Sequence, residues 1–317
     1  MTDLANQDRA ISPVIGIVLL VAVVVGLSAV SAGMFYSLNQ ERDPAPAVTM
    51  SLEPTDVGAV QTLSVEQGQT LEGENIEIRG GVKLADLSSR ELAAGDQHRI
   101  VPTATTVEVV WFGSQDTSYV IWEESVSQEA TAPTPDKGCS WVETESDSGT
   151  DNVKVIGEVV ACDVETSKGI EVQDGGVIIG ETTSGAKDID ADDATFYGDV
   201  EVETVFNLQD GLVTGSIQSH TADIKLDNGT VTESVSAVKV LEVVHGSSVG
   251  GNATSDKQVK VLNSEVAGSV VSDDSVKLQD ATVEGEVYVD AASFDCTNST
   301  INGQSCASYS PRDPATY

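Results

Sequence analysis

The sequence predicts a mainly β protein that carries one long hydrophobic α-helix at its N-terminal end. Three observations support this fold class. Residues 11–38 form a run of 28 positions without a charged side chain. Residues 43–127 contain short runs in which apolar and polar residues alternate, and residues 165–306 contain a repeat of 17 or 18 residues. We therefore predict a helix, a small antiparallel β-sandwich and a β-solenoid, in that order along the chain.

The uncharged run is long enough to cross a membrane. At about 1.5 Å of rise per residue, a helix of this length exceeds the roughly 30 Å of a hydrocarbon core. Ser12 is suited to an N-cap and Pro13 to the first turn. We expect one membrane-spanning helix over residues 11–42, with the bulk of the chain outside the cell. Small residues spaced four apart let two such helices approach closely. These residues are Ala22, Gly26, Ala29 and Gly33.

The ten residues before the run argue against a secretory signal peptide. They contain Asp3 and Asp8 beside a single basic residue, Arg9, whereas a signal peptide begins with a positive segment. The apolar run also exceeds the apolar core of about 7 to 15 residues that a signal peptide has. A weak cleavage site before Gly33 leaves secretion as one alternative, and a plain N-terminal anchor is the other.

The junction between this leader and the apolar run has a distinctive sequence. Arg9 and Ala10 are followed by the run Ile11-Ser12-Pro13-Val14-Ile15-Gly16-Ile17. This segment resembles the N-terminal segment of archaeal type IV pilins, particularly haloarchaeal ones. The resemblance implies that a prepilin peptidase cleaves after Ala10, so that residues 1–10 are a leader and Ile11 begins the mature protein. It also implies three partners: the membrane, the peptidase, and other pilin subunits that pack through the helix into a filament.

The chain is strongly acidic, with 51 Asp and Glu against 16 Lys and Arg and a formal net charge of −35. Such a surface repels nucleic acid and anionic lipid, so we expect no nucleic-acid partner. The acidic residues are scattered along the chain, which is typical of a solvated surface. Because concentrated salt screens their mutual repulsion, the composition favours a halophilic, high-salt environment.

Four cysteines lie beyond the helix. An even number of cysteines outside the cell permits disulfides, and three full connectivities exist. The pairs closest in sequence are Cys139 with Cys162 and Cys296 with Cys306. The spacing is not that of a zinc site and the three histidines are distant in sequence, so we expect no metal and no cofactor. Asn228, Asn252 and Asn298 begin N-glycosylation sequons and are candidate glycosylation sites.

The sequence predicts antiparallel strands in the region that follows the helix. Runs such as Ile76-Glu77-Ile78 alternate, and Gly80-Gly81 breaks the pattern. The resemblance implies a small β domain here as well, over residues 43–127. Residues 128–164 are expected to hold a linker and a polar loop over 143–152 that a bridge between Cys139 and Cys162 would close.

The repeat is marked by glycine and by a bulky apolar residue two positions earlier. Seven of eight reference positions are glycine, and successive positions are 17 or 18 residues apart. The reference positions are Gly180, Gly198, Gly215, Glu233, Gly251, Gly268, Gly285 and Gly303. The apolar residues are Ile178, Phe196, Val213, Val231, Val249, Val266, Val283 and Ile301.

A period of this length, with three short strands per turn, predicts a β-solenoid over residues 165–306 whose coils stack about 4.8 Å apart. The pattern resembles bactofilin-type β-helices by its repeat alone. Because the open ends of a solenoid invite strand addition, they are usually capped. We expect a bridge between Cys296 and Cys306 and the tail at 307–317 to close the C-terminal end.

Three functions are compatible with the sequence. The first is a type IV pilin-like subunit that displays an acidic β-rod at the cell surface for adhesion or surface contact. The second is a membrane-anchored surface protein that does not polymerise. The third is a polysaccharide-acting β-helix enzyme. A catalytic groove would need acidic residues aligned with Arg or Lys on adjacent coils, whereas the acidic residues are scattered. We therefore expect no catalytic residues and no enzyme.

Overall fold

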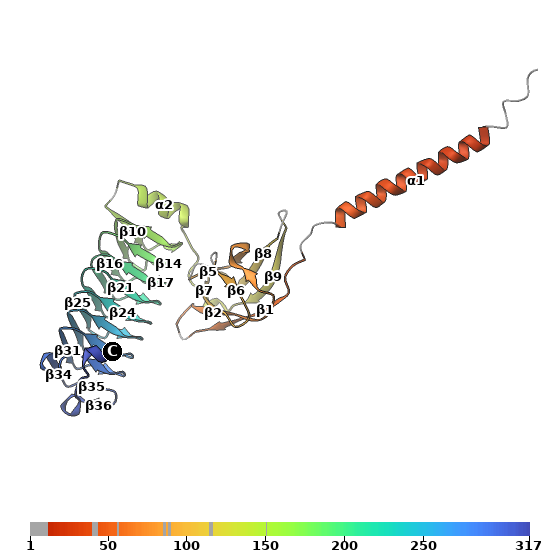
Figure 1. The fold of residues 1–317 in the computed structure, drawn as a ribbon. Helices are drawn as coiled ribbons and strands as arrows, with labels where there is room; N and C mark the ends of the chain where they lie inside the picture. The colour runs from red at the N-terminus through yellow and green to blue at the C-terminus, as the bar shows by residue number, and fades with distance from the viewer. Residues whose placement is uncertain are drawn as a thin grey trace, which may run out of the picture. The chain divides into compact units, whose positions relative to one another are not determined.

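The computed structural model describes residues 12–39, 44–55, 57–84, 87, 90–113, 117–149 and 151–317. The predicted fold class is confirmed, because a long N-terminal helix precedes a mainly β structure (Figure 1). The chain divides into two compact units, one of residues 1–45 and 111–119 and one of residues 46–110 and 120–317. The second unit holds most of the small β domain and the whole solenoid.

Helix α1 spans Ser12–Asn39, inside the predicted range of 11–42. Its 28 residues include no acidic or basic side chain, and its apolar residues are spread evenly around the axis. A helix that is apolar all round is adapted to an apolar environment rather than to one face of a soluble core. Side chains are described from Gly16 to Ala32.

The small β domain contains a four-stranded sheet, a three-stranded sheet and one short strand pair. The four-stranded sheet is antiparallel and has the order β1 (Val48–Pro54), β2 (Gln61–Gly68), β7 (Gln97–Pro102) and β5 (Gly81–Lys83). The three-stranded sheet has the order β4 (Ile76–Arg79), β8 (Thr106–Phe112) and β9 (Ser118–Ser125). The pair is β3 (Leu71–Glu72) with β6 (Glu91–Leu92), and the 3-10 turns are η1 (Gly73–Asn75) and η2 (Gln128–Ala130).

Alternation in this domain is clearest in the central strand β2, one face of which is buried. In β2, Leu63 and Val65 are both about 1% exposed, while Ser64 between them is half-buried on the other face. Trp122 of β9 is half-buried and donates its indole N–H to the Met50 carbonyl of β1 at 2.9 Å, which ties the two sheets together. Trp111 of β8 is also half-buried and stacks on Tyr119 of β9.

A short helix stands where a loop was predicted. Helix α2 spans Cys139–Asp147, so the first five residues of the predicted loop over 143–152 are helical. Val142 is buried in the solenoid core and Trp141 packs against it. Burial of these two side chains stabilises a polar sequence that has little helical pattern of its own.

The solenoid is made of three sheets, one on each side of the coil, whose strands pair in parallel except that β36 is antiparallel to β35. The nine-stranded sheet contains β10 (Asn152–Ile156), β13 (Gly169–Gln173), β16 (Ile189–Asp192), β19 (Phe206–Gln209), β22 (Ile224–Asp227), β25 (Val240–Val244), β28 (Gln258–Leu262), β31 (Ser275–Gln279) and β34 (Phe294–Thr297). The ten-stranded sheet contains β11 (Val159–Ala161), β14 (Val177–Ile179), β17 (Thr195–Tyr197), β20 (Leu212–Val213), β23 (Thr230–Val231), β26 (Ser248–Val249), β29 (Glu265–Val266), β32 (Thr282–Val283), β35 (Thr300–Ile301) and β36 (Gln304–Ser305). The eight-stranded sheet contains β12 (Val164–Thr166), β15 (Thr182–Ser184), β18 (Val200–Val202), β21 (Ile217–Ser219), β24 (Val235–Ala237), β27 (Ala253–Ser255), β30 (Val270–Ser272) and β33 (Val287–Tyr288). The remaining turns are η3 (Ala291–Ser293), η4 (Cys306–Ser308) and η5 (Pro314–Thr316).

Strand register confirms the period read from the sequence. Ile178 pairs with Phe196 and Phe196 with Val213, and the same column continues to Ile301. Every residue of this column is fully buried, so the apolar position of the repeat is the inward position of the ten-stranded sheet. The solenoid begins earlier than the predicted residue 165, because β10, β11 and β12 already form a complete coil.

The glycine column marks a close approach between backbones. A Cβ atom on Gly268 would overlap the carbonyl group of Gly251 in the preceding coil. At Gly285 the same atom would lie 2.6 Å from the carbonyl of Gly268, closer than any normal contact. At Gly268 and Gly285 a side chain would push adjacent coils apart, which explains the glycine at these two positions.

A second corner uses left-handed backbone instead of glycine. One residue in each of eight coils has φ between 49° and 55°, immediately after a strand of the nine-stranded sheet. These residues are Asp174, Asp193, Asp210, Asn228, His245, Asn263, Asp280 and Asn298. Asn, Asp and His tolerate this conformation better than other side chains, which explains the composition of the column.

The solenoid and the small β domain share a hydrophobic cluster within the second unit. Val60 and Val101 of the β domain are fully buried in a cluster with Ile179, which points outward from the ten-stranded sheet. At the edge of this contact, Arg99 of β7 forms an ion pair with Glu233. Glu233 is the residue that replaces glycine in the repeat, so the exception in the pattern coincides with a contact to another domain.

Candidate assembly helix and surface sites

The described side chains of α1 present a continuous apolar surface. Its large side chains from Ile17 to Val30 are between 50% and 65% exposed. The Ser28 hydroxyl donates to the Val24 carbonyl at 2.7 Å, so this polar group is satisfied within the helix. Among the described residues, no helix meets the combined length and hydropathy of a membrane span.

The four small residues of α1 lie on one face. At 3.6 residues per turn, positions that are three, four or seven apart fall on one side of a helix. A Cβ atom on Gly26 would meet nothing within 4 Å, so this face is open to a close neighbour. The small residues are Ala22, Gly26, Ala29 and Gly33. The predicted processing residues Arg9, Ala10 and Ile11 lie outside the described residues.

The first disulfide holds a cap on the N-terminal end of the solenoid. Cys139, the first residue of α2, is bonded to Cys162 in the first coil, with their Cα atoms 5.1 Å apart. The Lys168 ammonium donates to the Glu145 carbonyl at 2.8 Å and to the Ser148 carbonyl at 2.5 Å. These contacts satisfy carbonyl groups at the C-terminal end of α2, so the helix is fixed at both ends.

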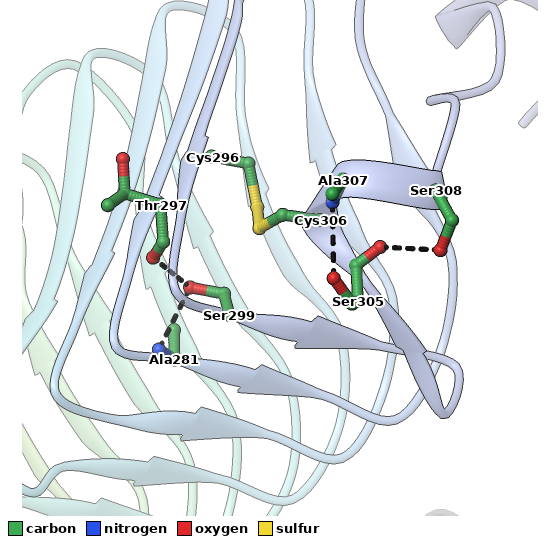
Figure 2. The surroundings of a disulfide bond; sticks show 8 residues. All are labelled: Ala281, Cys296, Thr297, Ser299, Ser305, Cys306, Ala307 and Ser308. Atoms are coloured by element: carbon green, nitrogen blue, oxygen red, sulfur yellow. Dashed lines mark hydrogen bonds between the residues drawn. A yellow bond between two sulfur atoms is a disulfide. The ribbon is translucent and has the colours of Figure 1, made fainter.

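The second disulfide closes the C-terminal end. Cys296 in β34 is bonded to Cys306, which follows the hairpin of β35 and β36 (Figure 2). Beside it, the buried Ser299 accepts a hydrogen bond from the Ala281 N–H at 3.0 Å and donates to the Thr297 carbonyl at 2.9 Å (Figure 2). The last coil is therefore joined both to its own hairpin and to the coil before it.

The C-terminal tail also covers the last strand of the eight-stranded sheet. Arg312 pairs with Tyr288 as a parallel bridge, and its N–H donates to the Val287 carbonyl at 2.9 Å. Glu286 accepts from the Tyr309 hydroxyl at 2.8 Å and from the Arg312 guanidinium at 2.9 Å. The Tyr309 hydroxyl, together with Asn302 and Arg312, lowers the pKa of the Glu286 carboxyl. The tail therefore occupies a strand edge that would otherwise be open.

Charged side chains on the nine-stranded sheet form pairs across coils. Lys154 lies 2.6 Å from Glu171, and Lys260 lies 2.7 Å from Glu242. Asp227 has a lowered pKa because Lys225 and then His245 hydrogen-bond to its carboxylate. These pairs are partly exposed and solvated, as expected for a surface that acidic residues dominate. In the described part of the chain, no group of three or more His, Cys, Asp or Glu side chains is arranged to hold a metal ion.

The three sequon asparagines occupy two kinds of corner. Asn228 and Asn298 belong to the left-handed column and are exposed. Asn252 is half-buried at the glycine corner, where its Oδ1 accepts from the Ser269 N–H at 2.8 Å. Its Nδ2 donates to the Tyr317 hydroxyl of the tail at 2.9 Å. The sequence motif does not distinguish these environments, because the distinction depends on neighbouring coils.

The similarity to a known protein family lies in the N-terminal segment. Residues 9–50 match the family model described as archaeal type IV pilin, N-terminal. The chain carries an archaeal type IV pilin N-terminal domain. The match spans the predicted processing site, α1 and the first residues of β1, and it confirms the resemblance inferred from residues 9–17. The matched segment is therefore similar to the N-terminal segment of type IV pilins. No curated protein matches the chain.

Proposed function

We propose that this protein is a type IV pilin-like subunit that a prepilin peptidase cleaves between Ala10 and Ile11. The helix that remains is held in the cell membrane and then assembles with other pilin subunits. The solenoid is the displayed part, an acidic β-rod used for adhesion or surface contact outside the cell. The observation that carries this proposal is the family match over residues 9–50, which covers the cleavage junction and the whole helix.

The composition of α1 supports both proposed stages, residence in the membrane and then assembly with other subunits. Its uncharged run of 28 residues is suited to lipid before assembly. Its small-residue face supports close packing against other helices afterwards, since small residues allow helix backbones to approach. One segment therefore serves first as an anchor and then as an assembly surface.

The second unit supports a displayed rather than a catalytic role. Two disulfides close the two ends of the solenoid, and disulfides persist in oxidising compartments outside the cell. Capped ends make a finite rod that does not extend by adding strands. The alternative function, a surface anchor that does not polymerise, uses the same helix without the assembly stage.

The experiment is to sequence the N-terminus of the surface-exposed protein. We expect the mature chain to begin at Ile11. A start at Met1 or Thr2 would favour the uncleaved anchor, and a start at Gly33 would mean a secreted protein. Ala10→Lys should abolish cleavage because it replaces the small residue at the cut, while the matched control Ala10→Gly should be cleaved normally. Normal filament assembly of the Ala10→Lys variant would contradict the proposal.

A further inference from the structure

Two of the three sequons stand at equivalent corners of the solenoid, and the third does not. We propose that Asn228 and Asn298 carry N-linked saccharides and that Asn252 is unmodified. The inference rests on the proposed function, because it requires export of the solenoid to the compartment in which saccharides are attached. It goes beyond that function by assigning covalent modification to one edge of the rod.

Asn228 and Asn298 have the same left-handed backbone and the same kind of partner in the preceding coil. Their φ angles are 54° and 52°, and both side chains are exposed. Each Nδ2 donates to the aspartate one coil earlier, Asn228 to Asp210 at 2.5 Å and Asn298 to Asp280. An N-glycosylated amide keeps one N–H, so each of these hydrogen bonds is compatible with an attached saccharide.

The other sequon residues are also placed alike. Thr230 begins β23 and Thr300 begins β35, and both are exposed. The middle residues, Gly229 and Ser299, are both buried. Each sequon therefore turns its asparagine and threonine to solvent while its middle residue anchors the corner (Figure 2 shows Ser299).

Asn252 has a structural role instead. Its backbone N–H donates to the Ser234 hydroxyl of the preceding coil at 3.0 Å, and its Oδ1 accepts from Ser269 of the following coil. Its Nδ2 is bonded to the Tyr317 hydroxyl, and the Tyr317 ring packs edge-on against Tyr288 at 5.0 Å. Both polar atoms of the Asn252 side chain are therefore engaged, Oδ1 by the following coil and Nδ2 by the tail, and the residue is half-buried between them, unlike the exposed Asn228 and Asn298.

The chemistry is transfer of a glycosyl group from an activated donor, a saccharide linked through its anomeric carbon to a lipid phosphate or diphosphate. A bond forms between the asparagine Nδ2 and the anomeric carbon. The bond from that carbon to the phosphate oxygen breaks, and its electron pair leaves with the lipid phosphate. The proton lost from Nδ2 passes to a base of the transferring enzyme. No oxidant or reductant is required.

The two saccharides would stand on one edge of the rod. Asn228 and Asn298 are 70 residues apart and belong to one column, separated by four coil steps. At about 4.8 Å per coil this corresponds to roughly 19 Å between attachment points. Bulky, hydrated groups at that spacing would keep this edge free of contact with neighbouring molecules, leaving the other corners for contact.

The chain contains its own matched control. Asn263 lies in the same column with φ of 50° and is exposed, but Glu265 stands where a sequon needs threonine. Glu265 is in register with Thr282, which is in register with Thr300, so the site accepts threonine without change of fold. Glu265→Thr should therefore create a third modified site at Asn263.

The experiment is glycopeptide mass spectrometry on the full chain, purified from cells that produce it. We expect saccharide mass on peptides containing Asn228 and Asn298 and none on Asn252. Thr230→Ala and Thr300→Ala should each remove one saccharide, Thr254→Ala should remove none, and Glu265→Thr should add one. A saccharide on Asn252, or unmodified Asn228 and Asn298, would overturn the inference. The N-terminus of the same sample reports independently on the proposed function, since cleavage at Ile11 without saccharide would refute only the sites.

Discussion

The solenoid and the small β domain are both built from short strands, yet their residues are constrained differently. In the solenoid each role is repeated along a column, so Val231 has the same inward position as Val249 one coil later. In the four-stranded sheet of the β domain the strands are antiparallel and no column repeats, so Leu63 of β2 faces His98 of β7 in a pairing that occurs once. The role of a solenoid residue can therefore be inferred from the other residues of its column, whereas the role of a β-domain residue depends on its own neighbours alone.

The difference makes exceptions in the solenoid informative. Glu233 departs from a glycine column, and it is the residue that forms an ion pair with Arg99 of the β domain. Asn252 directly follows the glycine column. It hydrogen-bonds to the coils on both sides and to Tyr317 of the tail. A comparable departure in the β domain could not be recognised, because there is no column from which to depart.

The largest effect is expected from removing a core aromatic side chain of the solenoid. Phe206 is fully buried and packs edge-on against Phe196 with ring centroids 6.1 Å apart. Phe206→Ala should lower the free energy of unfolding by about 3–5 kcal/mol. Hydrogen exchange should then rise most in the adjacent coils, because each coil contacts only its neighbours.

The matched variant in the β domain is Leu63→Ala, at a side chain about 1% exposed. It should destabilise by about 2–5 kcal/mol and raise exchange throughout β1, β2 and β7 together. If Phe206→Ala raised exchange equally in every coil, the nearest-neighbour description of the solenoid would be wrong.

A smaller effect is expected at the glycine corner. In Gly268→Ala the new methyl group would overlap the Gly251 carbonyl, so the coils must separate locally. We expect a loss of about 1–3 kcal/mol in chemical denaturation, the usual range for forced overpacking. Gly185→Ala is the control, because the nearest atom to its Cβ would be 3.7 Å away. Equal stability of the two variants would show that the column is not sterically required.

The smallest effect is a pH dependence confined to the β domain. The His98 side chain is buried, its Nε2 has no hydrogen-bond partner among the described residues, and burial lowers its pKa, with Arg90 acting in the same direction and Asp96 opposing. The unfolded chain takes up a proton near the ordinary histidine pKa of about 6.5, whereas the folded domain resists it. Stability should therefore fall as the pH drops below that value.

The measurement is denaturation of the full chain at pH 7 and at pH 5.5, with hydrogen exchange assigning the change to a region. His98→Gln should reduce the loss on acidification. His245→Asp is the control in the solenoid, because aspartate already stands in that column at Asp193 and Asp210. An unchanged pH dependence in His98→Gln would mean that this imidazole does not govern acid sensitivity.

The repeat was predictable because its signal is local and recurs. Val231 and Gly268 could be assigned to an inward column and a tight corner from spacing alone, and strand register confirms the period. The first coil was not predicted, because the repeat position 18 residues before Gly180 holds Cys162 instead of glycine. Its inward residue Val160 pairs with Ile178 as the column requires, but one apolar residue without glycine is too weak a signal.

The cap helix and the cysteine pairs were not predictable in the same way. The residues of α2 include only Trp141 and Val142 as large apolar side chains, and the helix depends on their burial against the first coil. Three connectivities were open for four cysteines, and only spatial proximity distinguishes them. The structure brings Cys139 to Cys162 and Cys296 to Cys306.

By itself the sequence determined the fold class, the 17- or 18-residue period and the type IV pilin-like character of the N-terminal segment. Each of these depends on residues that are close together in the chain or spaced at a constant interval. The tertiary structure alone decided where the solenoid begins, which cysteines pair, why Glu233 interrupts the glycine column and how Asn252 differs from Asn228. These depend on contacts between different coils, or between a coil and a distant segment, and such contacts exist only once hydrophobic burial has brought the chain together.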